Sequence, residues 1–195
     1  EGYWFEDSVS LGDALQHNPP VVARMGCHQS ENNLFYTQDA NGILGVAESH
    51  DPNAPSLLQQ LFRDNDHVDG RIFAICLAEE GGRLVVGGSN STYHTGPVQY
   101  VSMAQRTGYY VSLTSMEVDG HTISGHFGIA AIDSGSTFTY MGSEPYRRLR
   151  REIESYCDRN ENCGANRTDN CWALRRGLDR FPNVNIVFGE TKTTW

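Results

Sequence analysis

The chain has 195 residues, and its 15 Lys and Arg residues against 24 Asp and Glu residues give a net charge of −9 at pH 7. This acidic balance argues against a nucleic-acid backbone or an anionic membrane as the main partner. Hydrophobic residues make up 38% of the chain, enough for a packed core in one large or two small domains, and no apolar run approaches the about 20 residues that span a bilayer.

The first half of the chain contains a short helical pattern followed by two strand patterns. A helix is predicted from Pro55 to Arg63, and its buried face would consist of Leu57, Leu58, Leu61 and Phe62. Two buried strands are expected next, over 72–77 and 83–88. The polar and glycine residues 79–82 between them predict a turn.

The second half begins with an alternating pattern and continues with a helical one. Apolar and polar residues alternate over 108–123, and Asp119-Gly120 between two apolar runs predicts a β-hairpin. A helix is expected over 143–156, with Ser143 as N-cap and Pro145 in the first turn. The run Arg147–Arg151 is interleaved with glutamates, which is typical of a solvated helix face. The apolar face would consist of Tyr146, Leu149, Ile153 and Tyr156. The chain is therefore predicted to be mainly β with two short helices.

The cysteines and two sequons indicate the compartment. No pair has the Cys-x-x-Cys spacing of a zinc ribbon or a thioredoxin-like site. Asn90-Ser91-Thr92 and Asn166-Arg167-Thr168 are acceptor sequences for N-glycosylation, which makes Asn90 and Asn166 candidate glycosylation sites. Together with the clustered cysteines, they favour disulfides and the secretory pathway. An odd number of cysteines leaves one without a partner inside the chain; the candidates are Cys27, Cys76, Cys157, Cys163 and Cys171.

The motif with the clearest chemical content surrounds Asp133. The apolar run 128–132 leads to Asp133-Ser134-Gly135-Ser136-Thr137, and another largely apolar stretch follows. Gly135 permits a tight turn, and the hydroxyl groups can hold and orient a carboxylate. A bare Asp-Ser-Gly would be read as a β-turn with an Asx cap. The longer pattern within its apolar frame is more specific, and it predicts a catalytic carboxylate.

Other catalytic chemistries find no support in the sequence. The nearest histidines, His121 and His126, have no His-Glu-x-x-His spacing, and Gly-x-Ser-x-Gly is absent. The glycine pairs at 81–82 and 87–88 lack the Lys-Ser/Thr of a phosphate-binding loop. We therefore expect neither a metal nor a cofactor.

The Asp133 motif resembles that of the pepsin-like aspartic peptidases, whose two catalytic motifs read Asp-Ser/Thr-Gly-Ser/Thr in an apolar frame. The resemblance covers nearly the whole chain, and four further stretches agree with the family in order and spacing: Asp39–Ala47, Phe73–Gly88, Tyr109–Gly120 and Phe181–Phe188. It implies an incomplete bilobal fold, with residues 1–88 as the remainder of the N-terminal lobe and the start of the interlobe region. Residues 89–195 would form most of the C-terminal lobe.

A finer resemblance is to plasmepsin V and its apicomplexan relatives, the peptidases that process proteins in the secretory pathway. It is carried by Met25–His28, Asn33, Leu34, Phe35, Gln38, Cys76 and the cysteine-rich insertion. Plant nepenthesin-like enzymes share part of this pattern, and the resemblance implies a Cys27–Cys76 disulfide. One further pair is expected among Cys157, Cys163 and Cys171, with Cys171 as one member.

The family chemistry needs two carboxylates that share a proton across a bound water, and only Asp133 is in this chain. The resemblance implies that Ser134 and Ser136 support the carboxylate and that Gly135, Thr137 and Tyr109 contact a peptide or protein substrate. The first catalytic motif would precede Glu1 and the closing apolar segment would follow Trp195. We therefore expect a fragment that is inactive alone and a parent protein that is an aspartic endopeptidase.

The same resemblance implies a monomer in the secretory pathway or outside the cell, with a membrane anchor, where one exists, outside this chain. The alternative is a non-catalytic relative of the same fold that binds peptides or proteins. The intact Asp-Ser-Gly-Ser-Thr favours the enzyme, because a binding module need not retain an uncompensated carboxylate there. A homodimer that joins two Asp133 residues is disfavoured by the length of the chain.

Overall fold

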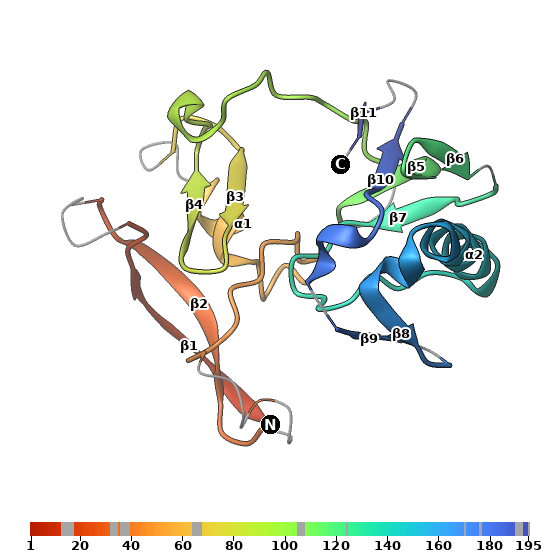
Figure 1. Cartoon of the computed structure of the whole chain (residues 1–195). Helices are drawn as coiled ribbons and strands as arrows, with labels where there is room; N and C mark the ends of the chain where they lie inside the picture. The colour runs from red at the N-terminus through yellow and green to blue at the C-terminus, as the bar shows by residue number, and fades with distance from the viewer. Residues whose placement is uncertain are drawn as a thin grey trace. The chain divides into compact units, whose positions relative to one another are not determined.

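A computed structural model describes residues 1–12, 18–31, 35, 40–63, 68–104, 108–123, 125–169, 171–175, 177–189 and 193–194 (Figure 1). The chain forms two compact units, Glu1–Pro97 and Val98–Trp195. Four positions that carry part of the resemblance lie outside the described residues: Asn33, Leu34, Gln38 and Asp39.

The first unit begins with a long hairpin for which the sequence analysis gave no bounds. Strands β1 (Gly2–Val9) and β2 (Val21–His28) pair antiparallel, in register from Gly2 opposite His28 to Val9 opposite Val21. Ala23 on β2 is fully buried, whereas the guanidinium of Arg24 lies 5.6 Å from the ring centre of Trp4 on β1. The hairpin therefore has an inward side and an outward side, as the period of two residues in a strand requires.

Helix α1 (Leu57–Leu61) packs against this hairpin and confirms the predicted helix. The Ser56 hydroxyl accepts from the Gln59 backbone N–H, and the Gln59 side chain accepts from the Ser56 N–H, which makes a capping box. Gln60 accepts from the Arg24 N–H at 2.8 Å and so ties α1 to β2. Leu58 and Leu61 are buried. Leu57 and Phe62 are only half-buried, because a helix of about one turn presents a narrow face.

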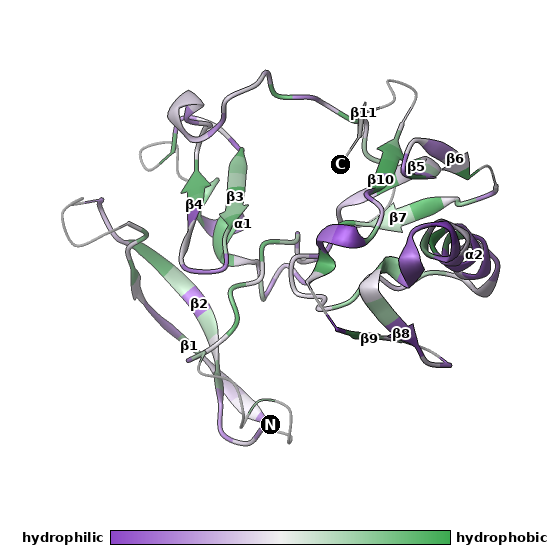
Figure 2. Ribbon diagram, in the orientation of Figure 1, coloured by the Kyte–Doolittle hydropathy of each residue, from purple (hydrophilic) through white to green (hydrophobic). Residues whose placement is uncertain are grey.

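The second hairpin of this unit confirms the strands predicted at 72–77 and 83–88, but the predicted burial was wrong: no residue of either strand is buried, because this hairpin is a separate two-stranded sheet. Strand β3 (Phe73–Leu77) pairs antiparallel with β4 (Gly82–Val86), and Figure 2 shows both as largely apolar. Gly82 at the turn has φ +151°, and a Cβ there would lie 2.6 Å from the Cys76 carbonyl oxygen. Only glycine fits this turn. The 3-10 turn η1 (Ser91–Tyr93) follows.

The second unit is built around strand β5 (Tyr110–Val118). The strand order is β11 (Thr193–Thr194), β10 (Val184–Phe188), β5, β6 (His121–Ile123), and β7 (Ile129–Ala131) also pairs with β5. Asp119 and Gly120 form the predicted turn between β5 and β6, with φ +50° and +80°. A two-residue hairpin turn of type I′ requires positive φ at both positions. The Asp-Gly pair therefore predicted this turn correctly.

Helix α2 (Ser143–Arg159) covers the core of this unit and is longer than the predicted helix. Leu149 and Ile153 pack on the buried cluster Met116, Val118 and Ile123. The N-cap is Gly142, not Ser143, and no side chain caps the helix; Ser143 is its first residue. Tyr146, predicted on the apolar face, is exposed because it lies in the first turn, before α2 meets the sheet.

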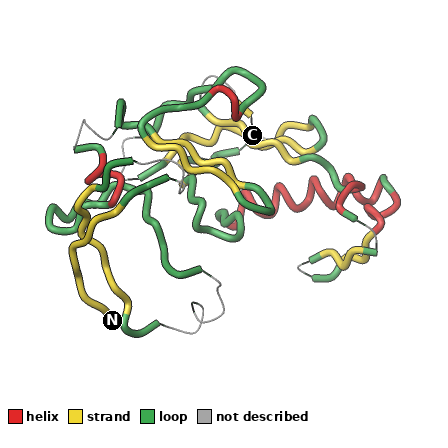
Figure 3. Tube along the Cα trace, turned by 90° about the vertical axis from the view of Figure 1, so that its left-hand side faces the viewer, coloured by secondary structure: helices red, strands yellow, loops and turns green. Residues whose placement is uncertain are grey.

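A small hairpin lies beyond α2, with β8 (Ala165–Arg167) paired to β9 (Trp172–Leu174) (Figure 3). The 3-10 turns η2 (Glu161–Gly164) and η3 (Leu178–Arg180) precede and follow it. Arg150 reaches it from α2: its guanidinium donates to the Asp169 carbonyl oxygen at 2.5 Å and lies 5.9 Å from the Trp172 ring. Arg150 is thus a structural residue and not part of the solvated face.

The disulfide pairing differs from the predicted one. Cys157 at the end of α2 pairs with Cys163 in η2, so one pair does form among the three clustered cysteines, but Cys171 is not in it. Cys171 is exposed and its backbone bonds to Thr168, whereas the two bridged cysteines are buried. Cys27 and Cys76 carry no disulfide either: Cys27 lies opposite Tyr3 in the β1–β2 hairpin, Cys76 lies opposite Arg83 in the β3–β4 hairpin, and no strand pairing among the described residues joins these two sheets.

Candidate active site

Asp133 is positioned by the β5–β7 pairing. Tyr110 to Ser112 of β5 lie opposite Ala131 to Ile129 of β7, and the Ile132 N–H donates to the Tyr109 carbonyl oxygen at 2.8 Å. These bonds hold the chain extended up to the residue before Asp133. The apolar run thus forms strand β7 up to Ala131, and one further backbone hydrogen bond at Ile132 leads the chain to the carboxylate.

The turn after β7 holds both carboxylate oxygens of Asp133. The Gly135 N–H donates to Oδ1 at 2.9 Å, and the Ser136 hydroxyl donates to Oδ2 at 2.8 Å. The Ser136 N–H also donates to the Asp133 carbonyl oxygen at 3.3 Å. The Asx-type turn and the Ser136 hydroxyl thus belong to one local structure, and together they fix the orientation of the carboxylate.

These contacts alter the acidity of the group. The Ser136 hydroxyl, and then the Gly135 N–H, stabilise the carboxylate and lower the pKa of Asp133 below its ordinary value. Slight desolvation acts in the opposite direction and is outweighed. Asp133 is therefore ionised at neutral pH and can accept a proton from a water molecule.

The other predicted site residues surround this turn in different ways. Ser134 and Thr137 are exposed, and in the described part of the chain neither donates to the Asp133 carboxylate. Tyr109 is half-buried and meets the motif through its backbone carbonyl. The structure thus contains the hydrogen bond expected from Ser136. The contacts of Gly135, Thr137 and Tyr109 with a substrate remain predictions.

Apolar side chains beside the carboxylate are open to solvent. Phe138 is 70% exposed and Tyr140 is 81% exposed, and Ile132 on the other side of Asp133 is 50% exposed. The motif is therefore flanked in the sequence by large apolar side chains that are open to solvent.

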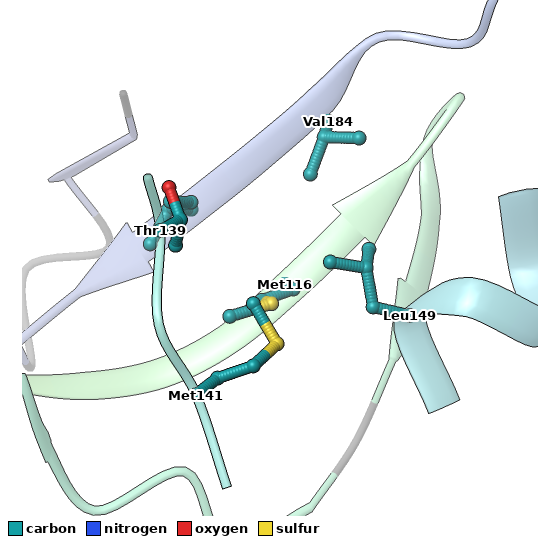
Figure 4. Close-up of a pocket in the computed structure, with 6 residues that line it drawn as sticks. Met116, Thr139, Met141, Leu149 and Val184 are labelled. Carbon is teal, nitrogen blue, oxygen red and sulfur yellow. The ribbon is translucent and has the colours of Figure 1, made fainter. Parts of the chain in front are cut away.

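Two residues after the motif line a hollow that the sequence analysis did not anticipate. Thr139 and Met141 line it, together with Met116, Leu149, Val184 and Ile186, and its volume is about 390 Å³ (Figure 4). Leu149 of α2 and Met116 of β5 are among its lining residues, so α2 and the sheet both contribute to the hollow.

Three other aspartates of the described residues lie in strands or turns. Asp7 is in β1, and Asp51 accepts from the Asn53 N–H at 2.8 Å in an Asx turn. Asp119 is in the β5–β6 turn.

In the part of the chain that the structure describes, no three His, Cys, Asp or Glu side chains form a group that would hold a metal ion. Neither α-helix among the described residues has the length and apolar character needed to cross a membrane.

Comparison with known proteins gives the family. The sequence model of the eukaryotic aspartyl protease family matches residues 1–193. The chain belongs to this family, and its mainly β structure agrees with part of a pepsin-like bilobal fold. The predicted family is therefore confirmed.

Individual relatives are consistent with this result. The chain is 31% identical to Aspartic protease 5 of Toxoplasma gondii, covering 96% of the chain and 24% of that protein. It is 22% identical to plasmepsin V of Plasmodium falciparum, covering 80% of the chain and 35% of the relative. Pepsin-3 of Oryctolagus cuniculus is 26% identical over 96% of the chain and 46% of its own length. The resemblance to plasmepsin V and its apicomplexan relatives is confirmed, and the chain spans about a quarter to a half of these proteins.

Proposed function

We propose that the protein containing this chain is an aspartic endopeptidase in which Asp133 is one of two catalytic aspartates. The observation that carries the proposal is the Asp133 turn, where Gly135 and Ser136 each hold one carboxylate oxygen at hydrogen-bond distance. A group fixed in this way is preorganised for proton transfer, because neither its orientation nor its ionisation has to change before reaction.

The reaction divides between two carboxylates. The ionised carboxylate takes a proton from a bound water, the resulting hydroxide attacks the carbonyl carbon of the peptide, and the protonated carboxylate donates a hydrogen bond to the carbonyl oxygen. The proton then passes to the leaving amine as the C–N bond breaks. The two groups share one proton and titrate as a pair. Asp133 supplies one of them, so we expect the chain of 195 residues alone to be inactive.

The compartment that we propose is the secretory pathway, with protein processing there as the role. Its support is the Cys157–Cys163 disulfide, together with the two sequons and the kinship with plasmepsin V. Disulfides form and persist mainly in oxidising compartments. We further propose a monomer that binds a peptide or protein substrate, with Gly135, Thr137 and Tyr109 lining its path and any membrane anchor outside this chain.

The test is peptide cleavage by the intact protein and by its Asp133→Asn variant. We expect Asp133→Asn to lower kcat/KM by at least about 10²-fold, because it removes a general acid–base group while keeping the shape of the side chain. The matched control is Asp119→Asn, the same chemical change in the β5–β6 turn, where asparagine tolerates the positive φ.

Three outcomes distinguish an aspartic endopeptidase from a non-catalytic binding protein. Loss of cleavage in Asp133→Asn alone, with an unchanged circular dichroism spectrum, supports the proposal. Undiminished turnover by Asp133→Asn refutes the role of Asp133. An intact protein that binds peptides but does not cleave them favours the alternative of a non-catalytic binding relative.

A further inference from the structure

The two glycosylation sequons adopt different local structures, which allows a choice between them. Asn90 is exposed in the loop after β4, and its Oδ1 accepts two hydrogen bonds from Thr92, one from the backbone N–H at 2.9 Å and one from the hydroxyl at 2.8 Å. The Asn90 Nδ2 donates to no described residue. The sequon threonine thus holds the carbonyl end of the carboxamide, and the nitrogen faces solvent.

The sequon at Asn166 has the opposite arrangement. Asn166 lies within β8, opposite Ala173 of β9, and its Oδ1 accepts from the Arg175 guanidinium at 2.5 Å. The Thr168 hydroxyl donates to the Cys171 carbonyl oxygen at 2.8 Å and accepts from the Cys171 N–H at 3.1 Å. Its sequon threonine is therefore committed to the β8–β9 turn and does not contact Asn166.

We propose that Asn90 is the N-glycosylated residue of this chain and that Asn166 is left unmodified. The inference rests on the secretory-pathway compartment proposed above. In the modification, Asn90 Nδ2 forms a bond to the anomeric carbon of an oligosaccharide carried on a membrane-bound pyrophosphate. The bond from that carbon to the pyrophosphate oxygen breaks, the pyrophosphate leaves as an anion, and the proton that Nδ2 loses passes to solvent.

The Thr92 contacts favour this chemistry at Asn90. The two hydrogen bonds to Oδ1 leave Nδ2 as the accessible end of the carboxamide. At Asn166, the arginine cation has taken the place of the threonine hydroxyl, so the carboxamide oxygen is held by a group outside the sequon.

The surroundings of Asn90 have room for a sugar. Asn90 lines a hollow of about 650 Å³ that is also lined by Arg83 and Tyr93. The Arg83 guanidinium lies 5.9 Å from the centre of the Tyr93 ring, so an aromatic face and a cation lie on the same side of the first unit as the acceptor. Aromatic rings and hydrogen-bond donors are groups against which a sugar packs well.

Sequence separation also favours Asn90. The Asn90–Thr92 contacts join residues two positions apart, so the turn can form before the rest of the chain folds. Asn166 is bound by a residue nine positions away within a hairpin, and this hairpin must stay open for the donor to reach it. Strand formation and modification therefore compete at Asn166 but not at Asn90.

The experiment is site-resolved occupancy in the protein expressed with a secretory leader in eukaryotic cells. Enzymatic removal of N-glycans in ¹⁸O water converts an occupied Asn into labelled Asp, and peptide mass spectrometry then reports each site in the wild-type protein without any variant. Asn90→Gln, Asn166→Gln and Thr92→Ala, compared by gel mobility before and after deglycosylation, give an independent readout.

We expect label at position 90 only, one glycan step on the gel, loss of that step in Asn90→Gln and Thr92→Ala, and retention in Asn166→Gln. Label at position 166, at both positions or at neither overturns the inference. Because the leader supplies the compartment, such a failure does not bear on the peptidase proposal. The compartment itself is tested separately, by fractionation of the native protein.

Discussion

The buried disulfide of the second unit predicts a measurable loss of stability when it is removed. Cys157 and Cys163 are six positions apart, and both are almost completely buried. Closing a loop of this size removes about 8 cal/mol/K of entropy from the unfolded chain, or about 2 kcal/mol at about 25 °C. The loop also holds Glu161, Asn162 and Cys163 in succession at φ +51° to +54°. Left-handed backbone is costly for residues other than glycine, so the cross-link opposes a local tendency to rearrange.

We therefore expect the Cys157→Ala/Cys163→Ala variant to lower the free energy of unfolding of the second unit by about 2 kcal/mol or more. Urea titration followed by fluorescence measures it, since Trp172 lies 5.9 Å from Phe181, edge to face, in the same unit. Cys171→Ala is the control, because Cys171 is exposed and has no disulfide. Equal midpoints for the double variant and the wild type would refute the reasoning. So would a non-reduced peptide map that links Cys171 to Cys157 or Cys163.

Three further results follow from the structure. Ser136→Ala removes the hydroxyl that lowers the pKa of Asp133, so the pKa rises and the acidic limb of the pH profile of kcat/KM moves to higher pH; an unmoved limb contradicts this, and Ser134→Ala is the control. Leu58→Ala opens a cavity under α1 and should destabilise the first unit by about 2–5 kcal/mol in urea unfolding, whereas Leu77→Ala, 72% exposed in the same unit, should change it by less than about 0.5 kcal/mol. Gly120→Ala places a Cβ at φ +80° with open space around it and should cost about 1–2 kcal/mol of thermal stability from backbone strain alone, unlike Gly96→Ala.

The local turns were predicted well because their causes lie within a few residues. The Asp119-Gly120 hairpin follows from the positive φ that these two residues tolerate. The Asp133 turn follows from one glycine and one hydroxyl within three positions of the carboxylate. For the same reason, the family could be recognised from the sequence: its motif is local.

The errors concern contacts between residues that are apart in the sequence or that compete for one partner. Three clustered cysteines allow several pairings, and the wrong one was chosen because the course of the chain after α2 determines which thiols meet. Arg150 was assigned to a solvated face, yet the β8–β9 hairpin folds back onto it. Helix periodicity identifies the faces of a helix, but it does not show what a later segment places against them.

The sequence by itself determined the apolar frame of the motif, the turn that holds Asp133 and membership of the aspartyl protease family. Tertiary structure alone decided that Cys157 pairs with Cys163, that Thr139 and Met141 line a hollow with residues of β5, β10 and α2, and that the two sequons differ. The physical reason is the range of the interactions. Turn geometry depends on backbone sterics and on hydrogen bonds over two or three residues, whereas disulfide pairing, burial and the competition for a side-chain amide depend on which distant segments pack together.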